Sequence, residues 1–128
     1  GFSFELLCLM HLDEIKQALG IDRILNDSSA WRSRQYGHGT QIDLVIERAD
    51  RNINICEMKF SGTPYIISAD YERRLRERIA IFRAETATRC STRMTMVTTY
   101  GVLPGKHSAI VDDEVTLDNL FTVTDDTK

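Results

Sequence analysis

The sequence predicts an α/β fold with the element order αβββαββ. Two segments with apolar residues at helical spacing, residues 3–19 and 68–86, lie before and after two β-rich runs, residues 42–48 and 53–60. The polar stretch 49–52 separates the two runs and predicts a hairpin. With 128 residues, of which 42% are hydrophobic, the chain is long enough for one domain around one core. We therefore expect a sheet that contains the hairpin, with a helix laid on it.

The first helix is predicted from an apolar stripe that is widest near its start. The stripe consists of Phe4, Leu7, Cys8, His11, Ile15 and Leu19, widened by Leu6, Leu9, Met10 and Leu12. This width predicts burial of the N-terminal half, and Gly20 can end the helix. Residues 26–29 are turn formers, Trp31 begins a short candidate strand, and residues 36–39 form a loop.

The second half of the chain predicts a helix, two strands and a final helical turn. Ser68 is a candidate N-cap for the helix, whose apolar stripe consists of Tyr71, Leu75, Ile79 and Phe82. Residues 92–100 are rich in β-branched side chains, and residues 108–111 resemble a shorter strand after the turn at Pro104. Thr116 is expected to cap a brief turn, and the polar residues 122–128 are expected to fray.

Composition excludes several classes of protein. A net charge of -3 is not that of a basic nucleic-acid binder, so any nucleic-acid site must be a local patch. The three cysteines are odd in number and lie in apolar segments, which indicates reduced thiols and a cytoplasmic location. The chain shows neither a bilayer-spanning apolar run nor a signal peptide. Because it starts without Met and almost at once enters a helical pattern, we expect a piece of a longer protein.

Three common catalytic or binding motifs are excluded. The stretch 101–106 is one residue short of a phosphate-binding loop, and His107 stands where Ser or Thr would be required. The three histidines have no Cys or His at zinc spacing. The chain also lacks the Gly-x-Ser-x-Gly motif of serine hydrolases.

The hairpin carries the residues that indicate chemistry. Side chains alternate between the faces of a strand, so Glu57 and Lys59 point to the same face, and Gln41 and Asp43 share a face on the first strand. Asp43 is expected opposite the apolar row of Ile42, Leu44 and Ile46. Asp43 and Glu57 become direct partners across the hairpin only if the loop between the strands holds an odd number of residues.

Two carboxylates converging in an apolar hairpin need a cation, because burial of like charges is unfavourable. Carboxylate oxygens suit Mg²⁺ or Mn²⁺, so Asp43 and Glu57 are the candidate metal ligands. Lys59 could orient an attacking water or stabilise charge growing on a phosphate. In the alternative interpretation, these three residues merely form the solvated face of an antiparallel sheet, and spacing alone favours it because Glu-x-Lys is common in strands.

The hairpin motif resembles the PD-(D/E)XK nuclease superfamily. Residues 41–48, 55–61 and 96–101 more narrowly resemble the C-terminal nuclease-type domain of bacterial and archaeal AAA-type ATPases. The resemblance covers residues 4–121 and implies a restriction-endonuclease-like core with a mixed central sheet. It implies metal-dependent cleavage of DNA, with Asp43 and Glu57 as ligands and Lys59 as the catalytic lysine. Ile42 stands where the superfamily name has Pro, a departure that many members share and that weakens the resemblance only slightly.

Further residues are candidates for the site. The additional acid of the family would be Glu5, although an acid in the first turn of a helix is favourable against the helix dipole alone. Gln41 could hold a water or a phosphate, or be an ordinary amide at a strand edge. Arg74 and Arg78 belong to an arginine cluster of the second helix that could contact a nucleic-acid backbone. Most of that cluster is expected to be a solvated face, because Glu72 and Glu77 are interleaved with it.

Two functions remain open at this point. The first is a Mg²⁺- or Mn²⁺-dependent deoxyribonuclease domain whose partners are DNA and the N-terminal ATPase part of the same protein. The second is a catalytically inactive module of the same fold that docks on protein or DNA, because fold and function separate readily.

Overall fold

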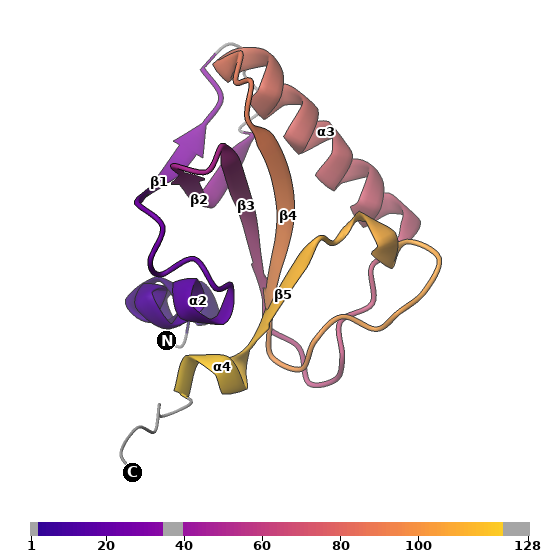
Figure 1. The fold of residues 1–128 in the computed structure, drawn as a ribbon. Helices are drawn as coiled ribbons and strands as arrows, with labels where there is room; N and C mark the ends of the chain where they lie inside the picture. Colours follow the sequence, from indigo (N-terminus) through magenta and orange to yellow (C-terminus); the bar gives the residue numbers. More distant parts are fainter. Residues whose placement is uncertain (1–2, 35–39, 122–128) are drawn as a thin grey trace.

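The computed structural model describes residues 3–34 and 40–121 and places a five-stranded sheet between two layers of helices (Figure 1). The elements are α1 (Phe4–Met10), α2 (Leu12–Ala18), β1 (Asn26–Arg32), β2 (Gln41–Arg48), β3 (Asn52–Lys59), α3 (Ala69–Thr86), β4 (Ser91–Thr98), the 3₁₀ turn η1 (Ser108–Ile110), β5 (Asp113–Thr116) and α4 (Leu117–Phe121). Strands β1, β2 and β3 pair antiparallel, while β3, β4 and β5 pair parallel. The predicted α/β class and mixed sheet are confirmed. The predicted loop 36–39 and tail 122–128 lie outside the described residues.

The core has one apolar layer on each face of the sheet. Helix α3 covers one face through Tyr71, Leu75 and Phe82, as predicted, while Ile79 is only partly buried. Helices α1, α2 and α4 lie on the opposite face (Figure 1). Full burial of one such aliphatic or aromatic side chain contributes roughly 1.5–3 kcal/mol. The two layers therefore hold the hairpin from both sides and fix the place of its polar end.

The ends of α3 follow from local sequence. The Ser68 hydroxyl accepts the Tyr71 N–H at 3.0 Å, which confirms the predicted N-cap. At the other end, Ala87 adopts a left-handed conformation with φ 53° and donates its N–H to the Arg83 carbonyl. Glycine is favoured at this position of a helix because it has no Cβ to clash there.

Replacing Ala87 with glycine should stabilise the protein by about 0.5–1 kcal/mol. The change relieves a left-handed strain of about 1–2 kcal/mol and costs about 0.4–1 kcal/mol of extra entropy in the unfolded chain. Ala80→Gly, also at an exposed alanine of α3, is the matched control and should destabilise by about 1 kcal/mol. Urea unfolding of both variants measures the difference, and equal destabilisation by both would contradict the expected relief of strain.

The N-terminal helical segment is broken into two helices, which the sequence did not predict. His11 lies between them with φ -116° and ψ 37°, and its N–H bonds to the Cys8 carbonyl. The predicted burial of the N-terminal half is also wrong, since Leu6 and Met10 are 57% and 72% exposed. The break allows both short helices to pack on the same cluster through Phe4, Cys8 and Ile15, and it leaves the rest of the wide stripe in solvent. The predicted end at Gly20 is confirmed by its φ of 75° and by the bonds that close the helix.

Strand β1 begins where the sequence predicted a turn. Residues 26–29 form the first half of the strand, paired with residues 45–48 of β2. Their side chains are polar because β1 is an edge strand whose outer face is exposed. Pairing with β2 therefore overrides the low strand propensity of Asn, Asp and Ser.

The C-terminal strand is displaced from its predicted place. Residues 108–110 form η1, and the strand that extends the sheet is β5, whose first residue is Asp113. Asp112 explains the shift, because its carboxylate accepts the Met94 N–H at 2.7 Å and its own N–H bonds to the Met94 carbonyl. The predicted turn after Thr116 is confirmed as α4, with the Asn119 side chain accepting the Thr116 N–H at 2.8 Å.

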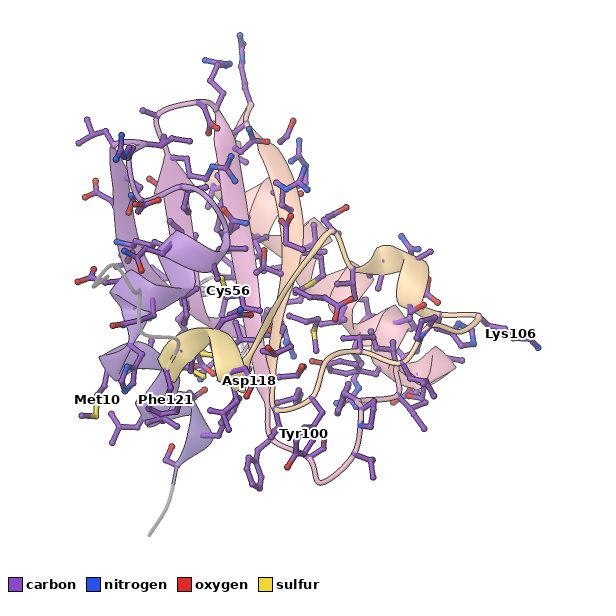
Figure 2. The ribbon with its side chains drawn as sticks, turned by 60° about the horizontal axis from the view of Figure 1, so that its bottom comes forward. Met10, Cys56, Tyr100, Lys106, Asp118 and Phe121 are labelled. Atoms are coloured by element: carbon purple, nitrogen blue, oxygen red, sulfur yellow. The ribbon has the colours of Figure 1, made fainter. Side chains whose placement is uncertain are left out.

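The cysteines are free thiols, as predicted. Cys8 and Cys56 are buried, the latter within the sheet (Figure 2), and Cys90 is half-buried. Burial raises the pKa of the Cys8 thiol to about 12, so it stays protonated and unreactive. In the described part of the chain, no helix is long and apolar enough to cross a membrane.

Candidate active site at the open end of the hairpin

The hairpin brings Asp43 and Glu57 to its open end. Strands β2 and β3 pair from Glu47 with Ile53 to Leu44 with Cys56, so the same register continued by one step sets Asp43 opposite Glu57. The loop between the strands holds residues 49–51, an odd number as the prediction required. The geometry of the turn thus fixes the alignment of the two acids.

A bulge re-aims Asp43 away from the regular pleat. The pairing of β1 with β2 shifts by one residue between the pairs Ser29–Val45 and Trp31–Ile42. Two residues of β2, Asp43 and Leu44, therefore stand opposite one residue of β1, Ala30. The predicted single apolar row of β2 is therefore wrong. Ile42 packs in the α3 cluster, whereas Leu44 and Ile46 pack in a cluster on the other face. Bulges of this kind are common beside active sites because they re-orient one side chain.

Gln41 lies beside Asp43, as the shared face predicted. Its Nε2 donates to Asp43 Oδ1 at 3.0 Å, and its Oε1 accepts from Arg32 Nη2 at 3.0 Å. An amide that is held from both sides has a fixed orientation. The chain of bonds runs from the exposed Arg32 of the edge strand to the half-buried Asp43.

Glu5 joins these acids from α1. A hydrogen bond with the Asp43 carboxyl group, burial, and the negative charges of Asp43 and Glu57 raise the pKa of Glu5 to about 7, and the nearby charge of Lys59 opposes the rise. The side chain of Glu5 is exposed, so burial is not the main cause. The first turn of α1, capped by Ser3, therefore contributes a third carboxyl group to the open end of the hairpin.

Glu57 is held by two side chains of α3. Tyr71 donates its hydroxyl to Glu57 Oε1 at 3.2 Å, and Arg78 Nη1 lies 2.6 Å from Oε2. The side chains of Glu57 and Arg78 are only 12% and 24% exposed. Burial, and then the charge of Glu57, raise the pKa of Tyr71, so its hydroxyl is a stable donor. Arg78 is thus committed to an acid of the hairpin, and the DNA contact predicted for it stays a prediction.

Lys59 is half-buried at the end of β3. Its Nζ lies 5.0 Å from the centre of the Tyr71 ring, and the guanidinium of Arg74 lies 5.6 Å from the same centre. Arg74 also pairs with Asp70 at 3.1 Å. The positive charge of Lys59 acts to lower the pKa of Glu5, against the effect of the two acids of the hairpin.

The donor set matches a hard cation with few protein ligands. Asp43 and Glu57 offer carboxylate oxygens, and the hydrogen bond with Asp43, burial and the charges of both acids raise the pKa of Glu5 near them. Within residues 3–34 and 40–121, however, no three acids, histidines or cysteines are grouped closely enough to hold an ion. Mg²⁺ is commonly bound by one or two carboxylates and completes its shell with water and phosphate. The residues therefore fit a two-ligand site and no fuller one.

No family model, curated protein or solved structure matches this chain. The superfamily resemblance therefore remains a prediction.

The contact between Arg78 and Glu57 was not predicted, although the spacing of Arg78 in the sequence indicated it. Arg78 lies three residues after Leu75 and four before Phe82, so it belongs to the buried face of α3. A charged residue on such a face needs a partner, and Glu57 is that partner. The bulge at Asp43 left no comparable signal.

In the absence of divalent cations, Glu5 should titrate near pH 7, and Asp43→Asn should bring its pKa back toward 4.5. Because the folded-state pKa lies above the unfolded value, the folded protein binds more protons between these pH values. The free energy of unfolding should therefore fall as pH rises from about 4.5 to about 7, and Asp43→Asn should lessen that fall. Carboxyl-carbon NMR and urea unfolding measure the two effects. A Glu5 that titrates near 4.5 in the unmodified protein would contradict this assignment.

Proposed function

We propose that this chain is a Mg²⁺- or Mn²⁺-dependent nuclease domain that hydrolyses phosphodiester bonds in DNA. One observation carries the proposal: the register of β2 with β3 brings Asp43 and Glu57 to the same end of the hairpin, where Lys59 follows Glu57 on β3. The pKa of Glu5 on α1, raised by a hydrogen bond with Asp43 and by the charges of both acids, adds to it. Strongly perturbed acids with a specific charged neighbour are typical of functional sites. The resemblance to a restriction-endonuclease-like core adds to this, and under it the chain acts with an N-terminal ATPase part in the cytoplasm.

The side chains of the site divide into binding and positioning roles. Asp43 and Glu57 would hold the ion, which when bound would activate water and offset charge on the phosphate. Lys59 orients the attacking water and stabilises the negative charge that grows on the phosphate oxygens. Gln41 fixes the Asp43 carboxylate through its 3.0 Å bond. Tyr71 and Arg78 fix Glu57, so both candidate ligands, Asp43 and Glu57, are held in place.

A catalytically inactive docking module is the second candidate, and one observation favours it. Both carboxylate oxygens of Glu57 already have partners, since Oε1 accepts from Tyr71 and Oε2 pairs with Arg78. An acid neutralised by arginine has less need of a metal ion. In that case the hairpin end is a structural polar cluster, and the fold serves to bind protein or DNA.

Calorimetry with Mn²⁺, nicking of supercoiled plasmid and cleavage of single-stranded DNA distinguish the two candidates. The nuclease proposal expects binding heat and metal-dependent nicking, both lost in Asp43→Asn and both abolished by EDTA. Asp27→Asn is the matched control, because Asp27 is exposed on β1 near the closed end of the hairpin, paired with Glu47. Absence of binding heat, of nicking and of single-strand cleavage in the unmodified protein would contradict the proposal and favour the docking module.

A further inference from the structure

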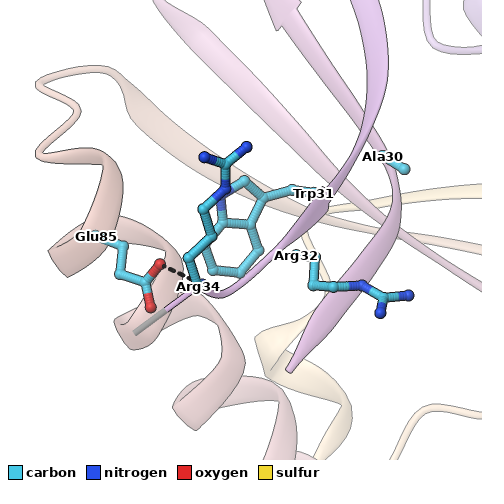
Figure 3. Close-up of a pocket in the computed structure, with 5 residues that line it drawn as sticks. All are labelled: Ala30, Trp31, Arg32, Arg34 and Glu85. Atoms are coloured by element: carbon cyan, nitrogen blue, oxygen red, sulfur yellow. Dashed lines mark hydrogen bonds between the residues drawn. The ribbon is translucent and has the colours of Figure 1, made fainter. Parts of the chain in front are cut away.

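A hollow on the surface lies at the end of β1, beside the hairpin. It has a volume of about 650 Å³ and is lined by Ala30, Trp31, Arg32, Arg34 and Glu85 (Figure 3). Trp31 and Arg34 point to the side of Glu85, while Ala30 and Arg32 point to the other side of the strand (Figure 3). The hollow therefore wraps around the end of the edge strand. Its volume lies within the range of pockets that bind small molecules.

Three residues of this hollow also line a smaller one at the candidate active site. A smaller hollow of about 190 Å³ shares Ala30, Trp31 and Arg32 with it and extends to Gln41, Ile42 and Asp43. The bonds from Arg32 to Gln41 and from Gln41 to Asp43 follow the same path. Trp31 and Asp43 thus line neighbouring hollows, so a linear ligand with one part at Asp43 passes along the shared residues to reach Trp31.

Arg32 and Arg34 carry positive charge that is available to a ligand. Both are exposed, and among the residues that the structure describes neither has a carboxylate within ion-pair distance. Arg32 donates instead to the neutral amide of Gln41. The Glu85 carboxylate bonds to the Ser33 hydroxyl and to the Arg34 N–H, which fastens the end of β1 to α3. By contrast, the predicted arginine cluster of α3 is neutralised by ion pairs to Asp70, Glu72, Glu77 and Glu57.

Trp31 gives the hollow a rigid aromatic wall. Its ring packs edge-on against Phe82 of α3, with centroids 5.2 Å apart and an angle of 80° between the planes. Phe82 is buried, so it holds the indole in place, while Trp31 itself stays partly exposed in the hollow. An aromatic ring flanked by arginines is the arrangement that binds single-stranded nucleic acid, by stacking a base and pairing with phosphates.

We propose that the hollow binds one unpaired nucleotide of a nucleic-acid strand. The base stacks on Trp31, Arg34 and Arg32 bind the flanking phosphates, and the backbone continues past Gln41 to Asp43. This inference rests on the proposed function and specifies its substrate class: a strand that is single-stranded next to the phosphate that is cleaved. A fully paired strand fits poorly, because its bases are stacked on one another and turned away from Trp31.

Trp31 is the only tryptophan of the chain, so its fluorescence reports directly on the hollow. The probes are a short single-stranded DNA, the same sequence as RNA, the DNA duplex and inorganic polyphosphate, each titrated in EDTA. We expect saturable quenching by the single strands and at least about tenfold weaker binding of the duplex. The tighter of the DNA and RNA strands identifies the substrate. Equal quenching by polyphosphate, or no quenching by either strand, would overturn the proposal.

Variants distinguish binding at the hollow from nonspecific attraction by positive charge elsewhere on the surface. Arg32→Ala and Arg34→Ala should each weaken binding of the single strand by about tenfold. Arg23→Ala, at an exposed arginine before the start of β1, should leave it unchanged. Trp31→Ala, followed by anisotropy of a labelled oligonucleotide, should also lose at least about tenfold. Because all titrations are metal-free, quenching without metal-dependent cleavage of the plasmid or of the single strand would retain nucleotide binding by the hollow and refute the proposed function. Cleavage without quenching would do the reverse.

Discussion

Lys59→Ala should slow metal-dependent DNA cleavage by about 10²- to 10³-fold, the usual cost of losing one preorganised charge at a reacting centre. Lys59 is half-buried at the end of β3, beside Glu5 and over the Tyr71 ring. It is a cation and cannot be a metal ligand, so Mn²⁺ binding should persist in the variant. Initial rates of plasmid nicking and Mn²⁺ calorimetry on the same preparation measure the two effects separately.

The control for Lys59 is Lys106, an exposed lysine in the loop before η1, on the other side of the molecule from α1 (Figure 2). Lys106→Ala should cleave at the unmodified rate. Loss of the Lys59 contact with Tyr71 should also lower the free energy of unfolding, by about 0.5–1 kcal/mol. If Lys59→Ala shows only that loss of stability and keeps its cleavage rate, Lys59 serves to cover Tyr71 and has no role in the reaction.

Elements with a local signature were predictable from the sequence. Three features depend on residues close together in the chain: the β-rich runs of the hairpin, the stripe of α3 with its Ser68 cap, and the end of α2 at Gly20. Strand β1 had no such signature, since its first residues become a strand only through pairing with β2. The break at His11 likewise depends on which side of the N-terminal stripe meets the sheet. Long-range contacts decided both cases.

The part of the candidate site that lies within the hairpin was predictable from the sequence, whereas the contributions of β1 and α3 were not. Loop parity was sufficient to set Asp43 opposite Glu57, because pairing across a hairpin is fixed by its turn. The bulge at Asp43 arises from β1, and the partners of Glu57 come from α3, so neither follows from the hairpin alone. The hollow at Trp31 is also formed between segments that are distant in the chain, residues 30–34 and Glu85.

Arg78→Ala should destabilise the metal-free protein by about 2–3 kcal/mol. Removing one partner of a buried ion pair leaves the other charge uncompensated, which costs about 3–5 kcal/mol when both are fully buried. The effect should be smaller here because the side chains of Glu57 and Arg78 are 12% and 24% exposed. Arg73→Ala is the matched control on the same helix and should have little effect, since its pairs with Asp70 and Glu77 are exposed and screened by solvent.

The same variant shows whether a cation can take the place of Arg78. If Glu57 is a metal ligand, Arg78 and the ion compete for the same carboxylate, so Mn²⁺ should raise the melting temperature of Arg78→Ala more than that of the unmodified protein. If Glu57 is only a structural acid, Mn²⁺ should leave the deficit of Arg78→Ala unchanged. The ion pair between Arg78 and Glu57 therefore tests the docking module that it favours. Only if Glu57 binds a metal should the loss of Arg78 increase the stabilisation by Mn²⁺.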